Sequence, residues 1–120
     1  MKKEAYNPKE VDNQKNEKLN VDELMIYNTI KNSKTKYITR EKILNILGYP
    51  QSDSNDRKVR SIVNKLITQH NLGIGSSYIQ SQRGYYIIRN EEDKQQAIKS
   101  LRNLHKGLLE RLEALESLKF

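Results

Sequence analysis

The most regular pattern in the chain is a repeat of aliphatic side chains within residues 53–70. They recur at the intervals i, i+3, i+4, i+7 and i+8, and are Val59, Ile62, Val63, Leu66 and Ile67. This spacing places them on one stripe of an α-helix. The opposite face is polar and basic, and consists of Asn55, Arg57, Lys58, Ser61, Asn64 and Lys65, with Arg60 at its edge. The pattern predicts an amphipathic helix with a buried back and a donor-rich front.

Two shorter helices are predicted ahead of it. The first begins after Asn20, with Glu23 at the capping-box position. Its expected buried face is Val21, Leu24 and Met25, together with Tyr27 or Ile30. The second begins after Thr39, covers residues 40–47 and ends at Gly48, which suits a left-handed turn. The β-favouring pair Tyr37-Ile38 is expected to join a later strand.

A β-hairpin is predicted after the long helix. Residues 74–81 and 85–89 are rich in β-branched and aromatic side chains, and Gln82-Arg83-Gly84 separates them. Gly84 can supply the positive φ that a three-residue hairpin loop needs. The order of helix, short strand, helix, helix and hairpin is that of a winged helix-turn-helix. We therefore predict an α+β, mainly α domain over residues 19–89, with three helices and a hairpin wing.

Residues 90–120 predict a long Leu-rich helix that starts at Asn90 with three acidic residues in its first turn. Apolar side chains follow a spacing close to a heptad pattern, which favours coiled-coil pairing and a homodimer. A helix folded back on its own domain is the alternative. The residues expected to form the dimer are Ile98, Leu101, Leu104, Leu108, Leu112 and Leu115, with His105 within the same seam and Leu118 at its edge.

Charge is unevenly distributed along the chain. The net charge is +7, and residues 31–47 and 48–89 each carry +4, whereas residues 90–120 balance six basic against six acidic side chains. A cationic excess confined to the middle of the chain favours a polyanionic partner such as nucleic acid. Residues 1–18 hold few apolar groups and are expected to be a disordered tail.

Several function classes find no support in the sequence. The chain has no cysteine, which fits a reducing, cytoplasmic compartment. It has no apolar run of the roughly 18 residues that a membrane span needs. We found no nucleophile motif, metal-ligand spacing or Gly-rich phosphate loop. The sequence therefore predicts no enzyme, cofactor, metal site or small-molecule ligand.

Residues 59–88 resemble a known family. The helix, the run Gly73-Ile74-Gly75-Ser76-Ser77 and the run Arg83-Gly84-Tyr85-Tyr86-Ile87-Ile88 are similar to those of small winged-helix DNA-binding proteins of phages and mobile elements of Gram-positive bacteria. The resemblance covers roughly residues 20–118. It implies binding of double-stranded DNA, in transcription control or replication initiation.

The resemblance also implies roles for particular residues. The helix over 54–70 is the expected recognition helix, and its outward side chains named above, Arg60 included, are expected to face DNA. At the wing, Gln82 and Arg83 are expected to contact phosphates or the minor groove. At the start of the second helix, phosphate is expected to be held by Thr39, Arg40 and Lys42. The link over 48–53 is longer than a tight helix-turn-helix allows.

A second function class remains open from the sequence. The chain can instead be a winged-helix interaction module, in which the C-terminal helix binds a host or phage protein and the basic charge is incidental. The position of the charge within residues 31–89 favours DNA.

Overall fold

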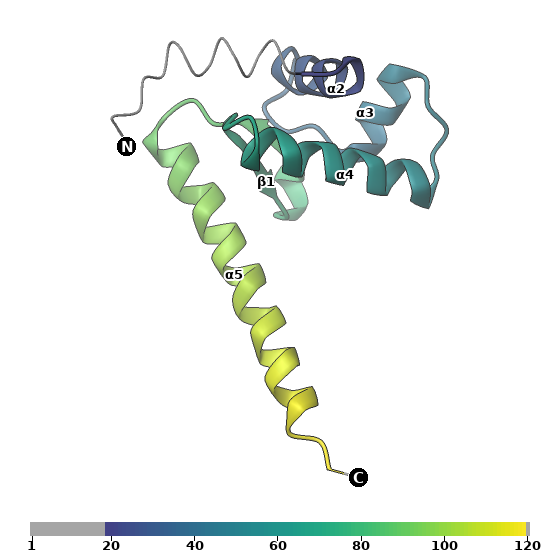
Figure 1. Cartoon of the computed structure of the whole chain (residues 1–120). Coiled ribbons are helices and arrows are strands. Elements are labelled where there is room, and N and C mark those ends of the chain that lie inside the picture. The colour runs from purple at the N-terminus through teal and green to yellow at the C-terminus, as the bar shows by residue number, and fades with distance from the viewer. Residues whose placement is uncertain (1–18, 120) are drawn as a thin grey trace.

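The computed structural model describes residues 19–119, so the tail expected over residues 1–18 lies outside the described residues. The fold is α+β and mainly helical. In chain order, the elements are α2 (Val21–Lys31), α3 (Arg40–Leu47), α4 (Asp53–Thr68), β1 (Ile74–Ser77), a 3₁₀ turn (Gln80–Gln82), β2 (Gly84–Ile87) and α5 (Glu91–Glu116). Helices α2–α4 and the hairpin gather at one end of the molecule, and α5 runs away from them as a rod (Figure 1).

The helices start where the sequence places their caps. Asn20 and Glu23 form a complete capping box at the start of α2, and Thr39 caps α3 through the backbone N–H of Lys42. Ser52 caps α4, and Gly48 ends α3 in the left-handed conformation with φ +78°. The predictions for Asn20, Thr39 and Gly48 are confirmed, because each cap depends on residues close together in the sequence.

The predicted buried face of α2 is wrong at Val21, Leu24 and Met25, and confirmed at Ile30. Val21 is 72 % exposed and Leu24 46 % exposed, while Ile26 and Ile30 are buried together with Glu23. The buried positions 23, 26 and 30 follow an i, i+3, i+7 pattern, which was not recognised because its first member is the charged Glu23. Glu23 is tolerated in the interior because its carboxylate accepts from the backbone N–H of Asn20 and lies 3.5 Å from Nε2 of His70.

The core lies between α2, α3, α4 and the hairpin. Helix α4 contributes Val59, Val63 and Leu66, each at most 3 % exposed, so the aliphatic stripe predicted from the sequence is confirmed. Ile43 and Leu44 of α3 pack into the same cluster. Burying this stripe leaves the polar side of α4 facing outward.

The hairpin is shorter and its loop longer than predicted. Strands β1 and β2 pair antiparallel from Ile74 opposite Ile87 to Ser77 opposite Gly84, and residues 78–83 form the loop around the 3₁₀ turn. Gly84 has the expected positive φ, at +125°, but it is the first residue of β2. The prediction of a three-residue loop is therefore wrong, because Tyr78 and Ile79 do not pair with the opposite strand.

A third segment joins the hairpin, as predicted for Tyr37-Ile38. The backbones of Ile38 and Tyr85 exchange two hydrogen bonds, of 2.9 Å and 2.8 Å. The approach is so close that a Cβ on Gly84 would collide with the backbone of Ile38. Gly84 thus provides both a positive φ and room for the segment before α3.

Helix α5 is anchored through a buried carboxylate at its start. Asp93, only 2 % exposed, accepts from Nζ of Lys36 at 2.6 Å and from the backbone N–H of Arg89 at 3.1 Å. Asn90 caps the helix by accepting from the N–H of Asp93. Ala97, one turn later, is also buried. These contacts fix the first turns of α5 beside the hairpin.

The remainder of α5 leaves its own domain. From residue 101 to residue 119 every residue except Gly107 is exposed. Of the side chains expected to dimerise, Ile98 is half-buried and the five leucines are 49–64 % exposed. Within the described residues, the leucine seam is therefore not folded back against the helices or the hairpin.

Gly84→Ala should destabilise the fold by about 1–3 kcal/mol, since it combines an unfavourable φ with a backbone collision. Gly107→Ala is the matched control, because Gly107 lies mid-helix with no atom near its missing Cβ. That control should stabilise the chain by roughly 0.5–1 kcal/mol. Thermal unfolding measures both, and equal effects would contradict the role assigned to Gly84.

Asp93 should make stability depend on pH in the acid range. The hydrogen bond from Lys36, followed by that from the Arg89 N–H, lowers the pKa of Asp93 below its ordinary 3.8. The ionised Asp93 carboxylate therefore adds to the free energy of unfolding above pH 3.8, and this stabilisation is lost as pH falls through the lowered pKa of the folded state. Asp93→Asn should be less stable than the native chain at neutral pH and lose less stability on acidification, as urea midpoints would show.

Glu92→Gln is the control for Asp93→Asn, because Glu92 occupies the same first turn of α5 but is exposed. It should leave the pH dependence of the native chain almost unchanged. If both variants titrate in the same way, the Lys36–Asp93 pair does not carry the acid sensitivity.

Candidate nucleic-acid interface

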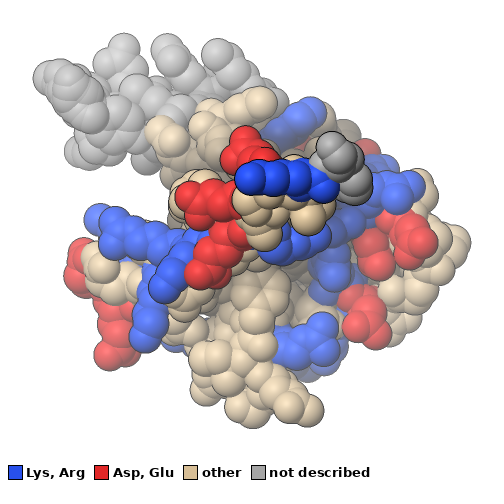
Figure 2. Space-filling view, turned by 90° about the horizontal axis from the view of Figure 1, so that it is seen from below, with Lys and Arg blue, Asp and Glu red and all other residues tan. Residues whose placement is uncertain are grey.

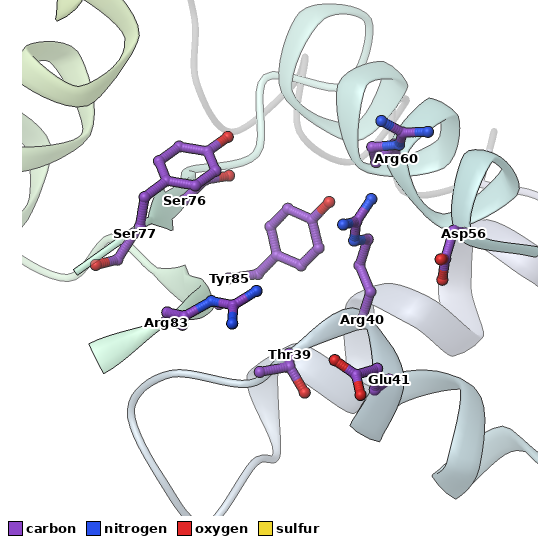
Figure 3. Close-up of a pocket in the computed structure, with 11 residues that line it drawn as sticks. Thr39, Arg40, Glu41, Asp56, Arg60, Ser76, Ser77, Arg83 and Tyr85 are labelled. Atoms are coloured by element: carbon purple, nitrogen blue, oxygen red, sulfur yellow. The ribbon is translucent and has the colours of Figure 1, made fainter. Parts of the chain in front are cut away.

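A hollow of about 280 Å³ opens where α3, α4 and the hairpin meet. The basic residues in its lining are Arg40, Arg60 and Arg83, and we call it the arginine hollow. Figure 3 shows the Arg40 side chain reaching toward the hydroxyl end of Tyr85, with Arg83 approaching from the hairpin and Arg60 on the neighbouring helix α4. The complete lining is Thr39, Arg40, Glu41, Asp56, Arg60, Ser76, Ser77, Tyr78, Arg83, Gly84 and Tyr85.

Backbone pairing explains why three separate elements meet here. Arg40 lies two residues after Ile38, and Arg83 lies two residues before Tyr85. The Ile38–Tyr85 bridge therefore places the start of α3 beside the end of the hairpin loop. Arg60 completes the group because it directly follows the buried Val59 on α4.

Among the described residues, the donors of the three arginines are uncommitted. Within residues 19–119 none of them forms an ion pair, although Glu41 and Asp56 line the same hollow. No hydrogen bond from their guanidinium groups to another described residue occurs either. Guanidinium groups bind phosphate or carboxylate oxygens bidentately. The hollow can thus accept an oxyanion without first breaking a described ion pair.

Tyr85 forms the floor of the hollow. Burial raises the pKa of its phenol, and the nearby charges of Arg40 and Arg60 only partly oppose that rise. The hydroxyl is therefore neutral at physiological pH and can donate a hydrogen bond. Neither Tyr85 nor Asp56 is among the site residues predicted from the sequence. The one signal for Asp56 was its position four residues before Arg60 on α4.

The outer face of α4 has one flank at Arg60, beside the arginine hollow, and another at Lys58, beside α2. Exposed residues on the face between these flanks are Arg57, Ser61 and Asn64. Lys58 lies roughly 160° around the helix from Arg60 at 3.6 residues per turn. It pairs with Asp22 of α2 at 3.1 Å and sits 5.3 Å from the centre of the Tyr49 ring. Lys58 therefore belongs to the flank away from the arginine hollow, as does the exposed Lys65.

Three other predicted contact residues lie apart from the hollow. Asn55 donates its side-chain amide to the carbonyl of Pro50 and so fastens the link before α4. Lys42 lines a different depression, beside the segment between α2 and α3. Gln82 is exposed in the hairpin loop. Of the twelve residues expected to contact DNA, the hollow brings together Thr39, Arg40, Arg60 and Arg83.

The long link between α3 and α4 is held at both ends. Nε2 of Gln51 donates to the carbonyl of Glu41 at 2.9 Å, and the Asn55 amide reaches Pro50 at 2.8 Å. These bonds connect the link to α3 and to α4. The extra residues therefore do not leave α4 unattached to its neighbour.

The charge is interspersed over the face seen along α5. Figure 2 shows Lys and Arg side chains separated by Asp and Glu rather than merged into one patch. A uniform basic field is thus not what distinguishes the arginine hollow. Its distinction is that three arginines from different elements line one recess.

Comparisons with known proteins give no further assignment. No protein-family model, curated protein or solved structure matches this chain. Among residues 19–119, no three His, Asp or Glu side chains cluster as metal ligands would. None of the helices in that range combines the length and apolar character needed to cross a bilayer.

Proposed function

We propose that the protein binds double-stranded DNA as a winged helix, with α4 in the major groove and the β1–β2 hairpin as the wing. The observation that carries this proposal is the convergence of Arg40, Arg60 and Arg83 beside the outer face of α4. Their donors are uncommitted within the described residues, and DNA presents regularly spaced phosphates that match them.

In this arrangement, a backbone phosphate occupies the arginine hollow. The first backbone N–H groups of α3, next to Thr39, add donors and a favourable helix dipole. Tyr85 supplies a neutral hydroxyl. A phosphate held there fixes the position of the protein on the duplex, since phosphate contacts set register.

Base contacts then come from the exposed centre of α4. Arg57 can read guanine O6 and N7, and Asn64 can read adenine N6 and N7. Lys58 has a lesser role because it already pairs with Asp22. The resemblance to winged-helix proteins of phages and mobile elements supports a role in transcription control or replication initiation in the cytoplasm of a bacterial host.

The second candidate function is a protein-interaction module. The exposed leucines of α5 favour it, since they offer an apolar surface to a partner. Salt dependence separates the candidates, because phosphate-driven binding weakens steeply as salt rises. The absence of duplex binding at low salt would favour the interaction module.

Alanine substitution of Arg40, Arg60 or Arg83 should weaken binding to a fluorescent duplex by about tenfold at low salt, because a hydrogen bond to a charged group contributes roughly 1.5 kcal/mol or more. Each lost phosphate contact should also reduce the slope of log K against log salt concentration by about 0.9. Fluorescence anisotropy over a salt series measures both quantities.

Lys94→Ala is the control for this series, because it removes an exposed charge from α5, outside the hollow. It should leave affinity and salt slope close to the native values. Should the three arginine variants behave like Lys94→Ala, the hollow is not a phosphate site.

Arg57→Ala and Lys58→Ala should separate the two flanks of α4. Arg57→Ala should weaken binding to a site selected from random duplexes by about 1–3 kcal/mol, with unchanged thermal stability. Lys58→Ala should change binding less and lower stability by at most about 1 kcal/mol, as expected for a surface ion pair. The reverse order of affinities would place the recognition surface on the α2 side of α4.

A further inference from the structure

The apolar seam of α5 holds six of the thirteen exposed large hydrophobic side chains among the described residues, and its role does not depend on DNA binding. Asp93 and Ala97 are buried against the domain in the first turns of α5, and the seam continues along the helix beyond them. Figure 1 shows the rest of the helix extending clear of the other elements. Its exposed leucines are Leu101, Leu104, Leu108, Leu109, Leu112 and Leu115, at 44–64 % exposure.

These apolar positions are symmetric about the point between Lys106 and Gly107. Ile98 and Leu115 are equally far from that point, as are Leu101 and Leu112, and Leu104 and Leu109. Two antiparallel copies related by a two-fold axis at this point place each residue opposite its counterpart. The same symmetry sets Leu108 against His105 of the second copy.

The widest part of the seam also lies near this midpoint. Leu104 and Leu109 stand on opposite edges of the main stripe. In an antiparallel pair, Leu104 lies level with Leu109 of the second copy, and each of them is about 7.5 Å along the axis from its own copy. The two leucines therefore broaden the interface where the helices cross.

The charges flanking the seam distinguish the two orientations. Residues 94–109 hold four basic side chains and no acidic one, whereas residues 110–116 hold three glutamates and Arg111. Antiparallel pairing lays residues 97–103 of each helix, with Lys99 and Arg102, beside residues 110–116 of the other. Arg102 is level with Arg111 of the second copy and shares an edge of the seam with Glu116, five residues further along. Parallel pairing sets the basic stretches at the same level along the axis.

We infer that α5 pairs with α5 of a second copy of this chain, antiparallel and crossing beside Gly107. The paired segment from Ile98 to Leu115 is roughly 27 Å long at 1.5 Å per residue. The two domains project from opposite ends of the pair. Each chain supplies the same surface, as a two-fold interface requires.

Sedimentation of the full chain tests the association. The native chain should be a dimer, and Leu108→Glu and Leu112→Glu should each be monomeric at about 100 µM. Asn103→Glu is the matched control, since it adds the same charge on the opposite face of α5 and should remain dimeric. A monomeric native chain, or a dimer that survives both leucine substitutions, overturns the proposal.

Thermal unfolding followed by circular dichroism shows whether the leucine variants still fold. Leu108 and Leu112 are already about half exposed in the single chain. Both variants should therefore retain the folded domain, although the end of α5 can lose helix when the pair separates. Loss of the domain's cooperative unfolding in these variants would show that the leucines support the fold, and would overturn the proposal.

Disulfide formation tests the orientation, because the natural chain has no cysteine. A mixture of Leu101→Cys and Leu112→Cys chains should form a disulfide joining position 101 of one chain to position 112 of the other. Leu101→Cys alone should form none, since the two copies of that position lie roughly 16 Å apart along the axis. Efficient self-linking of Leu101→Cys would overturn the antiparallel arrangement.

Charge reversal provides an independent measurement of orientation. Arg102→Glu should weaken the dimer by several-fold, and adding Glu116→Arg to the same chain should restore it. A double variant weaker than Arg102→Glu alone would contradict the proposed juxtaposition and would favour parallel pairing.

Discussion

The bridge between Ile38 and Tyr85 is the contact on which the arrangement of the domain depends. Two backbone hydrogen bonds join a segment ahead of α3 to the second strand of the hairpin, across 47 positions of sequence. Gly84 makes the approach possible, because any side chain there would meet the backbone of Ile38. The bridge thereby brings Arg40 next to Arg83. Without it, the hairpin would contribute no cation to the recess beside α4.

Two buried carboxylates hold helix starts against the domain. Glu23 closes the capping box of α2 and faces His70, which follows α4 in the chain. Asp93 accepts from the Arg89 backbone near the start of α5 and from Lys36, 57 residues away. In both places an acidic side chain satisfies local N–H groups and a distant basic group together. Each carboxylate therefore links a local helix signal to the tertiary fold.

The sequence predicted the parts of the fold that depend on near neighbours. The caps at Asn20 and Thr39, the stripe of α4 and the helical spacing of the α5 leucines all follow from residues within or next to one element. Only Ile30 of the buried face of α2 was predicted, because Glu23 interrupts the apolar pattern and Ile26 was overlooked. The hairpin loop was missed because Tyr78 and Ile79 look like strand residues. The convergence at the hollow could not be read from spacing, since a long-range bridge determines it.

Helix α5 has a mechanical property that follows from where it is held. Its grip on the domain is confined to the turns around Asp93 and Ala97, whereas the helix continues to Glu116. About 29 Å of rod thus lies beyond the last buried residue, at 1.5 Å per residue. A tilt of about 10° at that pivot would displace the far end by about 5 Å. A small change in the packing around Asp93 consequently produces a much larger displacement at Glu116.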